Sequence, residues 1–375
     1  MFNNFDESRW EQLEKNWTAW WNNEMERPML VAQKRKQVPG RVVPQWWKNK
    51  WWGMGPAPFE NSAEAIAEEA AKDLEEAVPV GDAWPGVWLN FGPGVAAAFL
   101  GGVVDIQPQT FWFVPGKWEG KSLREIKPEY IPDEPWWTAT KELTAACVAR
   151  FAGHAQFGFT DLGGNLDIAA SLRDTQKLLC DCLDDPEGVD ALVAAVTKAW
   201  LRYYDELHAI IGPAGRGTSP WAPIWSPGRT YMLQSDFSYM ISPEQFERWV
   251  VPDLTACCAK LDHSAYHLDG KGELPHLDLL LAIPKLDCIQ WIPGDGNANG
   301  ASRDWIGIFK RVRAAGKLVQ QFAPMEDIIA LAKEIPLKGY TFGVFGHSDH
   351  LEAGFAAIWK EAEDFRKKQK PTVAV

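Results

Sequence analysis

Short apolar runs recur along the chain, and the segments between them carry apolar residues at helical spacing. The runs show little alternation of polar and apolar residues, which is typical of parallel strands that are buried on both faces. Counted from Met29, the pattern predicts eight strands, at 29–33, 87–91, 155–160, 232–238, 264–268, 287–291, 318–322 and 340–345. Strands that alternate with helices over this length favour a closed (β/α)8 barrel, or TIM barrel, over an open sheet.

The first 60 residues depart from this β-α pattern. An amphipathic helix is predicted from Glu7 to Met25, with its apolar positions at Trp10, Leu13, Trp17, Trp20 and Trp21. The first strand follows, and residues 34–60 are predicted to form an irregular insertion rich in Trp and Pro. A second irregular stretch is predicted for residues 105–135. Because no linker or repeat interrupts the rest, we expect residues 1–375 to form a single domain with these additions.

Composition excludes several classes of protein. The net charge of −12 argues against nucleic acid or an anionic membrane surface as the main partner. No run of apolar residues is long enough for a transmembrane helix, and the first residues lack the pattern of a secretory signal. The six cysteines fall in helical and strand patterns, which does not suit a disulfide framework. We therefore expect a cytoplasmic protein with buried thiols.

Tryptophan is unusually frequent, with 21 residues. Many lie early in the chain, and each large rigid ring can serve either core packing or binding. If they serve binding, the predicted site is an aromatic-walled pocket for a sugar, an aromatic ring or a cationic methyl donor. We expect parts of residues 44–58 and 105–137 to fold over the mouth of the barrel, with Trp46, Trp47 or Trp112 in contact with substrate.

Polar side chains gather where the predicted strands end. In (β/α)8 barrels the carboxyl ends of the strands carry the chemistry. The residues at these ends are Asn90, Asp161, Asp236, His267 with Asp269, Gln290, Gln320 or Gln321, and His347 with Asp349 and His350. We take Asn90, Asp161 and Gln290 as candidate catalytic residues and Asp236 as a candidate substrate-binding residue. The alternative is that these side chains only cap their strands.

The strand end that says most about possible chemistry consists of His267, Leu268, Asp269 and Gly270. Residues two apart on a strand point to the same face, so His267 and Asp269 converge. With His347 they would supply three nitrogen and oxygen ligands, and three protein ligands with one open position are typical of catalytic zinc. The alternative is a metal-free pair in which Asp269 orients His267 as an acid or base.

Two segments resemble the uroporphyrinogen decarboxylase superfamily, which includes zinc-dependent methyltransferases that work with corrinoid proteins. Ser242 to Glu247 (SPEQFE), followed by Val251-Pro252, is similar to its segment after the fourth strand. His267 to Gly270 falls where the methyltransferases carry a His-x-Cys-Gly zinc motif, and His347 follows eighty residues later, near their last zinc cysteine. The resemblance covers residues 60–365 and implies a barrel, a divalent metal such as zinc, a corrinoid protein as partner and often a homodimer.

The departures from this family shape the predicted function. Asp269 and His347 stand where the family has thiolates, and a His/Asp/His set suits oxygen ligands more than a thiol. The decarboxylase's arginine-rich motif is not matched by Met29 to Gln37. We therefore predict a metal-dependent enzyme that acts on a small organic substrate by methyl or other one-carbon transfer. The alternatives are a lyase or decarboxylase acting on a carboxylate or carbohydrate, with Asp161 as acid or base, and a non-catalytic binding barrel.

Overall fold

The computed structural model describes residues 5–48, 57–107, 111–345 and 350–369. Its strands are β1 (Met29–Arg35), β2 (Ala77–Gly81), β3 (Gly86–Trp88), β4 (Val103–Ile106), β5 (Phe111–Val114), β6 (Gln156–Gly158), β7 (Thr218–Ser219), β8 (Thr230–Gln234), β9 (His263–Asp269), β10 (Cys288–Ile292), β11 (Leu318–Pro324) and β12 (Tyr340–Phe345). Its α-helices are α1 (Glu7–Trp21), α2 (Gln45–Lys48), α3 (Ala57–Glu60), α4 (Ala63–Glu76), α5 (Ala96–Phe99), α6 (Pro135–Phe151), α7 (Asn165–Arg173), α8 (Thr175–Asp184), α9 (Pro186–Ile211), α10 (Pro243–Cys258), α11 (Leu277–Ala282), α12 (Ile306–Ala314), α13 (Met325–Ala332) and α14 (Leu351–Gln369).

The strands form three sheets. The largest has seven strands in the order β2-β1-β12-β11-β10-β9-β8, and all neighbours in it are parallel except β1 and β2. A parallel sheet of three strands has the order β3-β6-β7, and β4 and β5 form an antiparallel hairpin. The fold is therefore α/β with a parallel sheet. Among the described residues no ladder joins the seven-stranded and three-stranded sheets, so strand pairing does not show the closed barrel that the sequence predicts.

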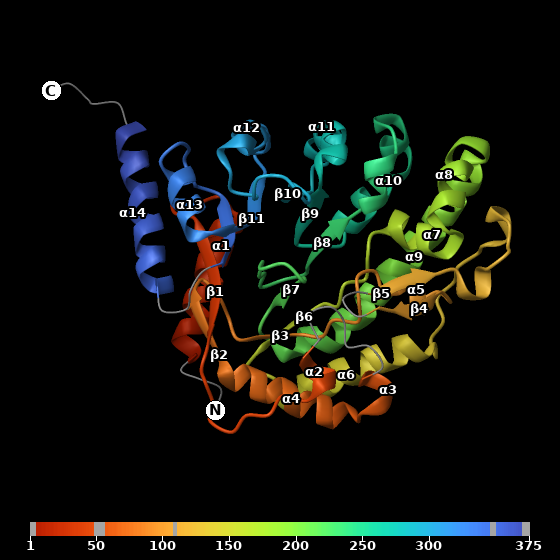
Figure 1. Cartoon of the computed structure of the whole chain (residues 1–375), viewed down its shortest axis with the longest axis horizontal. Helices are drawn as coiled ribbons and strands as arrows, with labels where there is room; N and C mark the ends of the chain where they lie inside the picture. The colour runs from red at the N-terminus through yellow and green to blue at the C-terminus, as the bar shows by residue number, and fades with distance from the viewer. Residues whose placement is uncertain (1–4, 49–56, 108–110, 346–349, 370–375) are drawn as a thin grey trace.

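The seven-stranded sheet is buried on both faces. On one face, alternate residues such as Leu30, Tyr231 and Tyr266 join the main hydrophobic core with the helices. Helices α10 to α14 follow one another along one side of the molecule, while α4, α6 and α9 lie on the opposite side next to β3 and β6 (Figure 1). The other face, here called the inner face, carries the intervening residues of the same strands. This alternation follows from the two-residue repeat of a strand.

Helix α1 covers one end of the inner face. Its tryptophans pack in a second core cluster with inner-face residues near the amino ends of five strands, namely Met29, Met232, Ala265, Cys288 and Leu318. The indole N–H of Trp21 donates to the Trp225 carbonyl oxygen (2.9 Å), and that of Trp17 donates to the Asp82 carbonyl oxygen (3.0 Å). Each fully buried ring of this kind contributes roughly 2–3 kcal/mol of hydrophobic free energy. The covered end leaves the carboxyl ends of the strands as the accessible mouth.

Two sequence predictions about local structure are corrected. The strand predicted at 232–238 ends at Gln234, because the carboxylate of Asp167 accepts the backbone N–H groups of Asp236 (3.1 Å) and Phe237 (2.7 Å) and holds a 3-10 turn, η4 (Asp236–Met240). The stretch 105–135 is not wholly irregular, since it contains part of the β4–β5 hairpin. No helix in the described ranges has the length and apolar character needed to cross a membrane.

Candidate metal centre

Three predicted site residues converge at the carboxyl ends of β8 and β9. His267 and Asp269 lie two residues apart on β9, Gln234 of β8 pairs with His267, and Asp236 follows two residues later at the start of η4. One ligand atom of Asp236, one of His267 and one of Asp269 all lie within 4.8 Å of one another. The structure thus adds to the predicted His267–Asp269 pair a carboxylate that the sequence had suggested only as a substrate-binding residue.

The spacing of these donors can be tested against a zinc ion. Donor atoms that each lie about 2.1 Å from one tetrahedral zinc are about 3.4 Å apart, so donors that lie up to 4.8 Å apart need to close by at most about 1.4 Å. Asp236 is exposed and His267 and Asp269 are half-buried, so side-chain rotation can supply this movement. A neutral imidazole and two carboxylates are also a donor set that zinc accepts. The residues present therefore fit a divalent metal.

A chain of hydrogen bonds behind His267 fixes its tautomer. The side-chain N–H of Gln320 donates to the Gln321 carbonyl oxygen (2.8 Å), which can only accept. The side-chain oxygen of Gln320 must then accept from the Gln290 amide, and the Gln290 oxygen must accept from Nδ1–H of His267. In the neutral ring this arrangement leaves Nε2 without a proton, as a metal ligand or a base requires. Metal-binding histidines usually have a second hydrogen bond of this kind.

Register places this chain of side chains across three neighbouring strands. Gln290 pairs with His267 on one side and with Gln320 on the other. Gln290 and Gln320 are fully buried, so water does not compete for these hydrogen bonds. Gln290, predicted as a catalytic residue, therefore contacts His267 from behind and acts as a positioning residue for it.

Acidic groups surround the three donors. Burial, and then the charge of Asp236, raises the pKa of Asp167 to about 8. Burial is also the largest cause that raises the pKa of Glu273 to about 10, followed by the charges of Asp236 and Asp167. The pKa of Asp269 is raised by burial and lowered by His267. Within the described chain, none of these carboxyl groups forms an ion pair with Lys or Arg, so a bound cation would relieve their mutual repulsion.

Asp161 and Asn90 hold the turns that follow β6 and β3. The carboxylate of Asp161 accepts the Gly163 N–H (2.9 Å), and the side-chain oxygen of Asn90 accepts the Gly92 N–H (2.9 Å). Burial is the main cause that raises the pKa of Asp161 to about 7, and the charge of Asp236 contributes. Both side chains are buried. Asp161 can therefore exchange a proton near neutral pH, while Asn90 shapes a turn.

The other predicted site residues are not among these three donors. His347 and Asp349 fall outside the described residues, so the structure neither adds His347 to the centre nor removes it. His350 is exposed just before α14. Trp112 is 62% exposed on β5, and Trp46 packs against the main core. The predicted contact of these two tryptophans with substrate stays a prediction.

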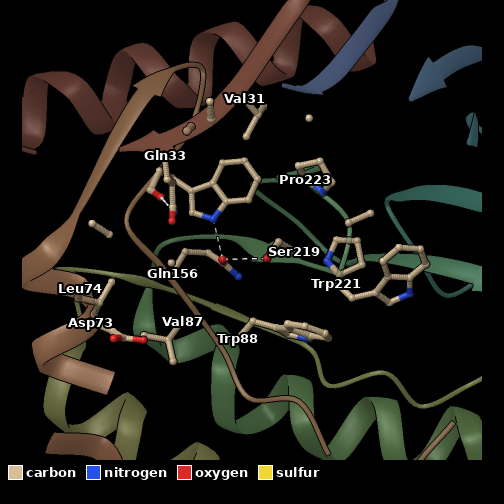
Figure 2. A pocket seen from close by; sticks show the side chains of 18 of the residues that line it. Val31, Gln33, Asp73, Leu74, Val87, Trp88, Gln156, Ser219, Trp221 and Pro223 are labelled. Carbon is tan, nitrogen blue, oxygen red and sulfur yellow. Dashed lines mark hydrogen bonds between the residues drawn. The ribbon is translucent and has the colours of Figure 1, made fainter. Parts of the chain in front are cut away.

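A cavity of about 420 Å³ has residues of both parallel sheets and of α4 in its wall (Figure 2). It is lined by residues of β1, β3, β6, β7, β11 and β12, and Trp47 is among them. Trp221, in the loop after β7, lines the cavity and also packs edge-on against His267, with ring centroids 5.2 Å apart and an interplanar angle of 81°. Sequence reasoning missed Trp221, because a strand of two residues such as β7 leaves no readable pattern.

Comparisons with known proteins support the fold. No protein-family model matches the sequence, and no curated protein matches it. Among solved structures, a methyltransferase from Methanosarcina mazei superposes with a TM-score of 0.60 and 12% identity, over 94% of this chain and 99% of that one. A B12-independent methionine synthase from Shewanella sp. W3-18-1, in complex with selenomethionine, gives a TM-score of 0.34 and 12% identity, over 61% of this chain and 67% of that one. The first similarity indicates a shared fold, and the second is too weak to support an argument.

Proposed function

We propose that this chain is a metal-dependent enzyme whose divalent metal, zinc in the first instance, is held by Asp236, His267 and Asp269. The observation that carries the proposal is the convergence of these three donors within 4.8 Å, in an acidic mouth. A bound zinc would act as a Lewis acid toward an oxygen atom of a small organic substrate. His347, as predicted from the sequence, is a further candidate ligand.

The chain's own residues supply the rest of the chemistry. Gln290 and Gln320 hold the neutral His267 ring in the tautomer that carries its proton on Nδ1. The indole of Trp221 covers one edge of the His267 ring and keeps water from it on that side. Asp161, with its pKa raised to about 7, can give or take a proton at its carboxyl oxygen.

The proposed reaction is transfer of a methyl or other one-carbon group. The resemblance of SPEQFE and of the His267–Gly270 segment to the uroporphyrinogen decarboxylase superfamily supports this, as does the fold shared with the Methanosarcina mazei methyltransferase. On the same resemblance alone we propose a corrinoid protein as partner and a homodimer. The cysteine pattern of the sequence is the basis on which we propose a cytoplasmic location. Because strands of both parallel sheets line one cavity, we also propose that the two sheets form a single barrel.

A lyase is the second candidate. The observation that favours it is Asp161, whose pKa of about 7 suits general acid–base catalysis without a metal. In that case His267 and Asp269 form an acid–base pair, and decarboxylation or elimination replaces methyl transfer.

The test begins with metal content. The full chain is stripped with a chelator and titrated with zinc, and we expect it to bind about one equivalent. The variant His267→Ala should lose this zinc, while His154→Ala, which removes an exposed histidine before β6, should keep it. Zinc-loaded and zinc-free proteins are then incubated with candidate methyl donors and free cob(I)alamin, and methylcobalamin is followed by its absorbance.

Wild-type zinc binding by His267→Ala would show that the centre is assigned to the wrong residues. Turnover that survives exhaustive chelation would show that no metal is needed. If the stripped protein also releases carbon dioxide or an elimination product, the lyase becomes the better description.

A further inference from the structure

The 3-10 turn η4, which carries Asp236, is held by contacts outside the sheet. His267 and Asp269 lie within β9, whose backbone is fixed by pairing with β8 and β10. Asp236 instead follows the end of β8 at Gln234, so no strand pairing among the described residues holds it. The side chains that contact η4 therefore decide whether Asp236 stays close to the two donors of β9.

Asp167 of α7 binds the start of η4. Its two carboxylate oxygens accept the backbone N–H groups of Asp236 (3.1 Å) and Phe237 (2.7 Å). Ser238 closes the turn from within, because its hydroxyl donates to the Ser235 hydroxyl (2.7 Å) and its N–H donates to the Ser235 carbonyl oxygen (2.9 Å). The backbone of Asp236 is thus bonded to a neighbouring helix and not only to its own strand.

His276 contacts the same turn from a second element, η5 (Lys271–His276). It is fully buried, and its ring is stacked on that of Phe246, with ring centroids 4.4 Å apart and an interplanar angle of 6°. Because a carbonyl oxygen can only accept, Nε2–H of His276 donates to the Ser238 carbonyl oxygen (2.9 Å). The stack fixes the plane of the ring, and the hydrogen bond fixes η4 relative to the ring.

Tyr239 joins η4 to the turn that follows Asp269. Residues three apart in a 3-10 helix lie on the same side, so Tyr239 lies on the side of Asp236, and both are exposed. The Tyr239 ring lies against two glycines: a Cβ added at Gly272 would be 2.6 Å from the ring, and one added at Gly270 would be 3.0 Å from it. The absence of a side chain at these two positions therefore lets the ring pack directly on the backbone beyond Asp269.

We propose that His276 and Tyr239 are positioning residues, which hold η4 so that Asp236 can serve as a ligand of the metal. His276 acts through the Ser238 carbonyl group, and Tyr239 acts by joining η4 to the turn after Asp269. In this role neither side chain contacts the metal. The inference rests on the proposed function, because it explains how an exposed residue beyond the end of one strand remains close to two residues of the next.

The experiment measures the zinc affinity of the full chain by competition with a chromophoric chelator. Tyr239→Ala should weaken zinc binding roughly tenfold, as the loss of supporting contacts does, and Tyr239→Phe, which keeps the ring, should stay within about threefold of the wild type. Gly272→Ala should reproduce the effect of Tyr239→Ala, because the added methyl group displaces the ring. Met240→Ala removes the exposed neighbour of Tyr239 in η4, and as the matched control it should bind zinc as the wild type does.

His276 is tested by a pair of variants. His276→Leu should weaken zinc binding roughly tenfold, while His276→Gln, whose amide N–H can replace Nε2–H as the donor to Ser238, should restore most of the affinity. Urea unfolding of each metal-free variant identifies any that fails to fold. Because Tyr239 is exposed, its variants test the proposal even if the buried His276 does not tolerate leucine.

A double-mutant cycle separates positioning from a general loss of stability. In an Asp236→Ala background the ligand that η4 carries is absent, so Tyr239→Ala should cause no further loss of the remaining zinc affinity. Equal effects of Tyr239→Ala in the two backgrounds would overturn the proposal, as would wild-type affinity in both Tyr239→Ala and His276→Leu.

Hydrogen exchange of the metal-free protein gives a second readout, which does not depend on zinc. The backbone N–H groups of Asp236 and Phe237 should be protected in the wild type and should exchange about tenfold faster or more in Tyr239→Ala and His276→Leu. Unprotected N–H groups in a wild type that binds zinc would show that η4 is not held, so only this inference would fail. A wild type that protects them but binds no zinc would show that the metal centre is wrong, and the role given to η4 would fail with it.

Discussion

Replacing Gln290 with leucine tests whether the hydrogen-bonded chain behind His267 prepares that residue for a metal. The change removes two hydrogen bonds, one with His267 and one with Gln320. His267 is half-buried and can turn toward water, but Gln320 is fully buried and its side-chain oxygen loses its donor. A buried acceptor without a partner costs about 1–3 kcal/mol, so the free energy of unfolding should fall by about that amount.

The effect on the metal should be larger than the effect on stability. Without Gln290 the His267 ring is free to adopt the other tautomer or to rotate, and losses of such supporting contacts weaken metal binding roughly 10–100-fold. Zinc affinity is measured by competition with a chromophoric chelator, and stability by urea unfolding of the metal-free protein.

Gln321→Leu is the matched control, because Gln321 is as deeply buried in β11 but both polar atoms of its side chain lack partners in the described chain. Its replacement should stabilise the protein by about 1 kcal/mol and leave zinc affinity unchanged. If Gln290→Leu binds zinc within about threefold of the wild type, the hydrogen-bonded chain does not orient His267 and the reasoning is wrong.

Two further predictions concern stability away from the metal donors. Burial raises the pKa of Asp253 to about 6 from 3.8, so protonation of this carboxyl group favours the folded state. Relative to Asp253→Asn, the wild type should be most stable below pH 4, and its free energy of unfolding should fall by roughly 3 kcal/mol as pH rises past 6. Urea unfolding of both proteins across this pH range measures the difference. A parallel pH dependence in the two proteins would contradict this. At Gly163, where φ is +89°, an added Cβ would lie 2.6 Å from the Gly94 Cα, so Gly163→Ala should lower the free energy of unfolding by more than about 2 kcal/mol. Gly153 also has a positive φ, of +80°, but a Cβ added there would meet nothing within 4 Å, so Gly153→Ala should lower the free energy of unfolding by only about 1 kcal/mol. Equal shifts of the melting temperature in the two variants would show that crowding at Gly163 is unimportant.

Local patterns were sufficient for much of the fold. The apolar runs correctly indicated most strands of the seven-stranded sheet. Ser242 and Gln245, which lie in the SPEQFE segment, form a capping box at the start of α10. Each of these signals lies within a few residues of chain. The very short β7 and the β4–β5 hairpin were missed, because two to four residues carry too little pattern.

The site was only partly predictable. That His267 and Asp269 share a face follows from the period of a strand, but the approach of Asp236 depends on the register of β8 against β9. The hydrogen bond from His267 to Gln290 likewise depends on the pairing of β9 with β10. Trp221 reaches His267 from a loop whose path no local pattern indicates. Register and loop paths are set by tertiary packing, which no single stretch of sequence contains.

The position of α1 has a consequence for the order in which the chain can fold. Its tryptophans are made first, yet they pack against Met232, Ala265, Cys288 and Leu318, which emerge from the ribosome more than two hundred residues later. Until then the helix can pack only against early residues such as Met29, Val31 and Trp84, and short helices gain most of their stability from such packing. A nascent chain would therefore expose several large aromatic rings for most of its synthesis, which is a hazard for aggregation. The strands β8 to β11, which are made late, are thus the ones that shelter the first helix.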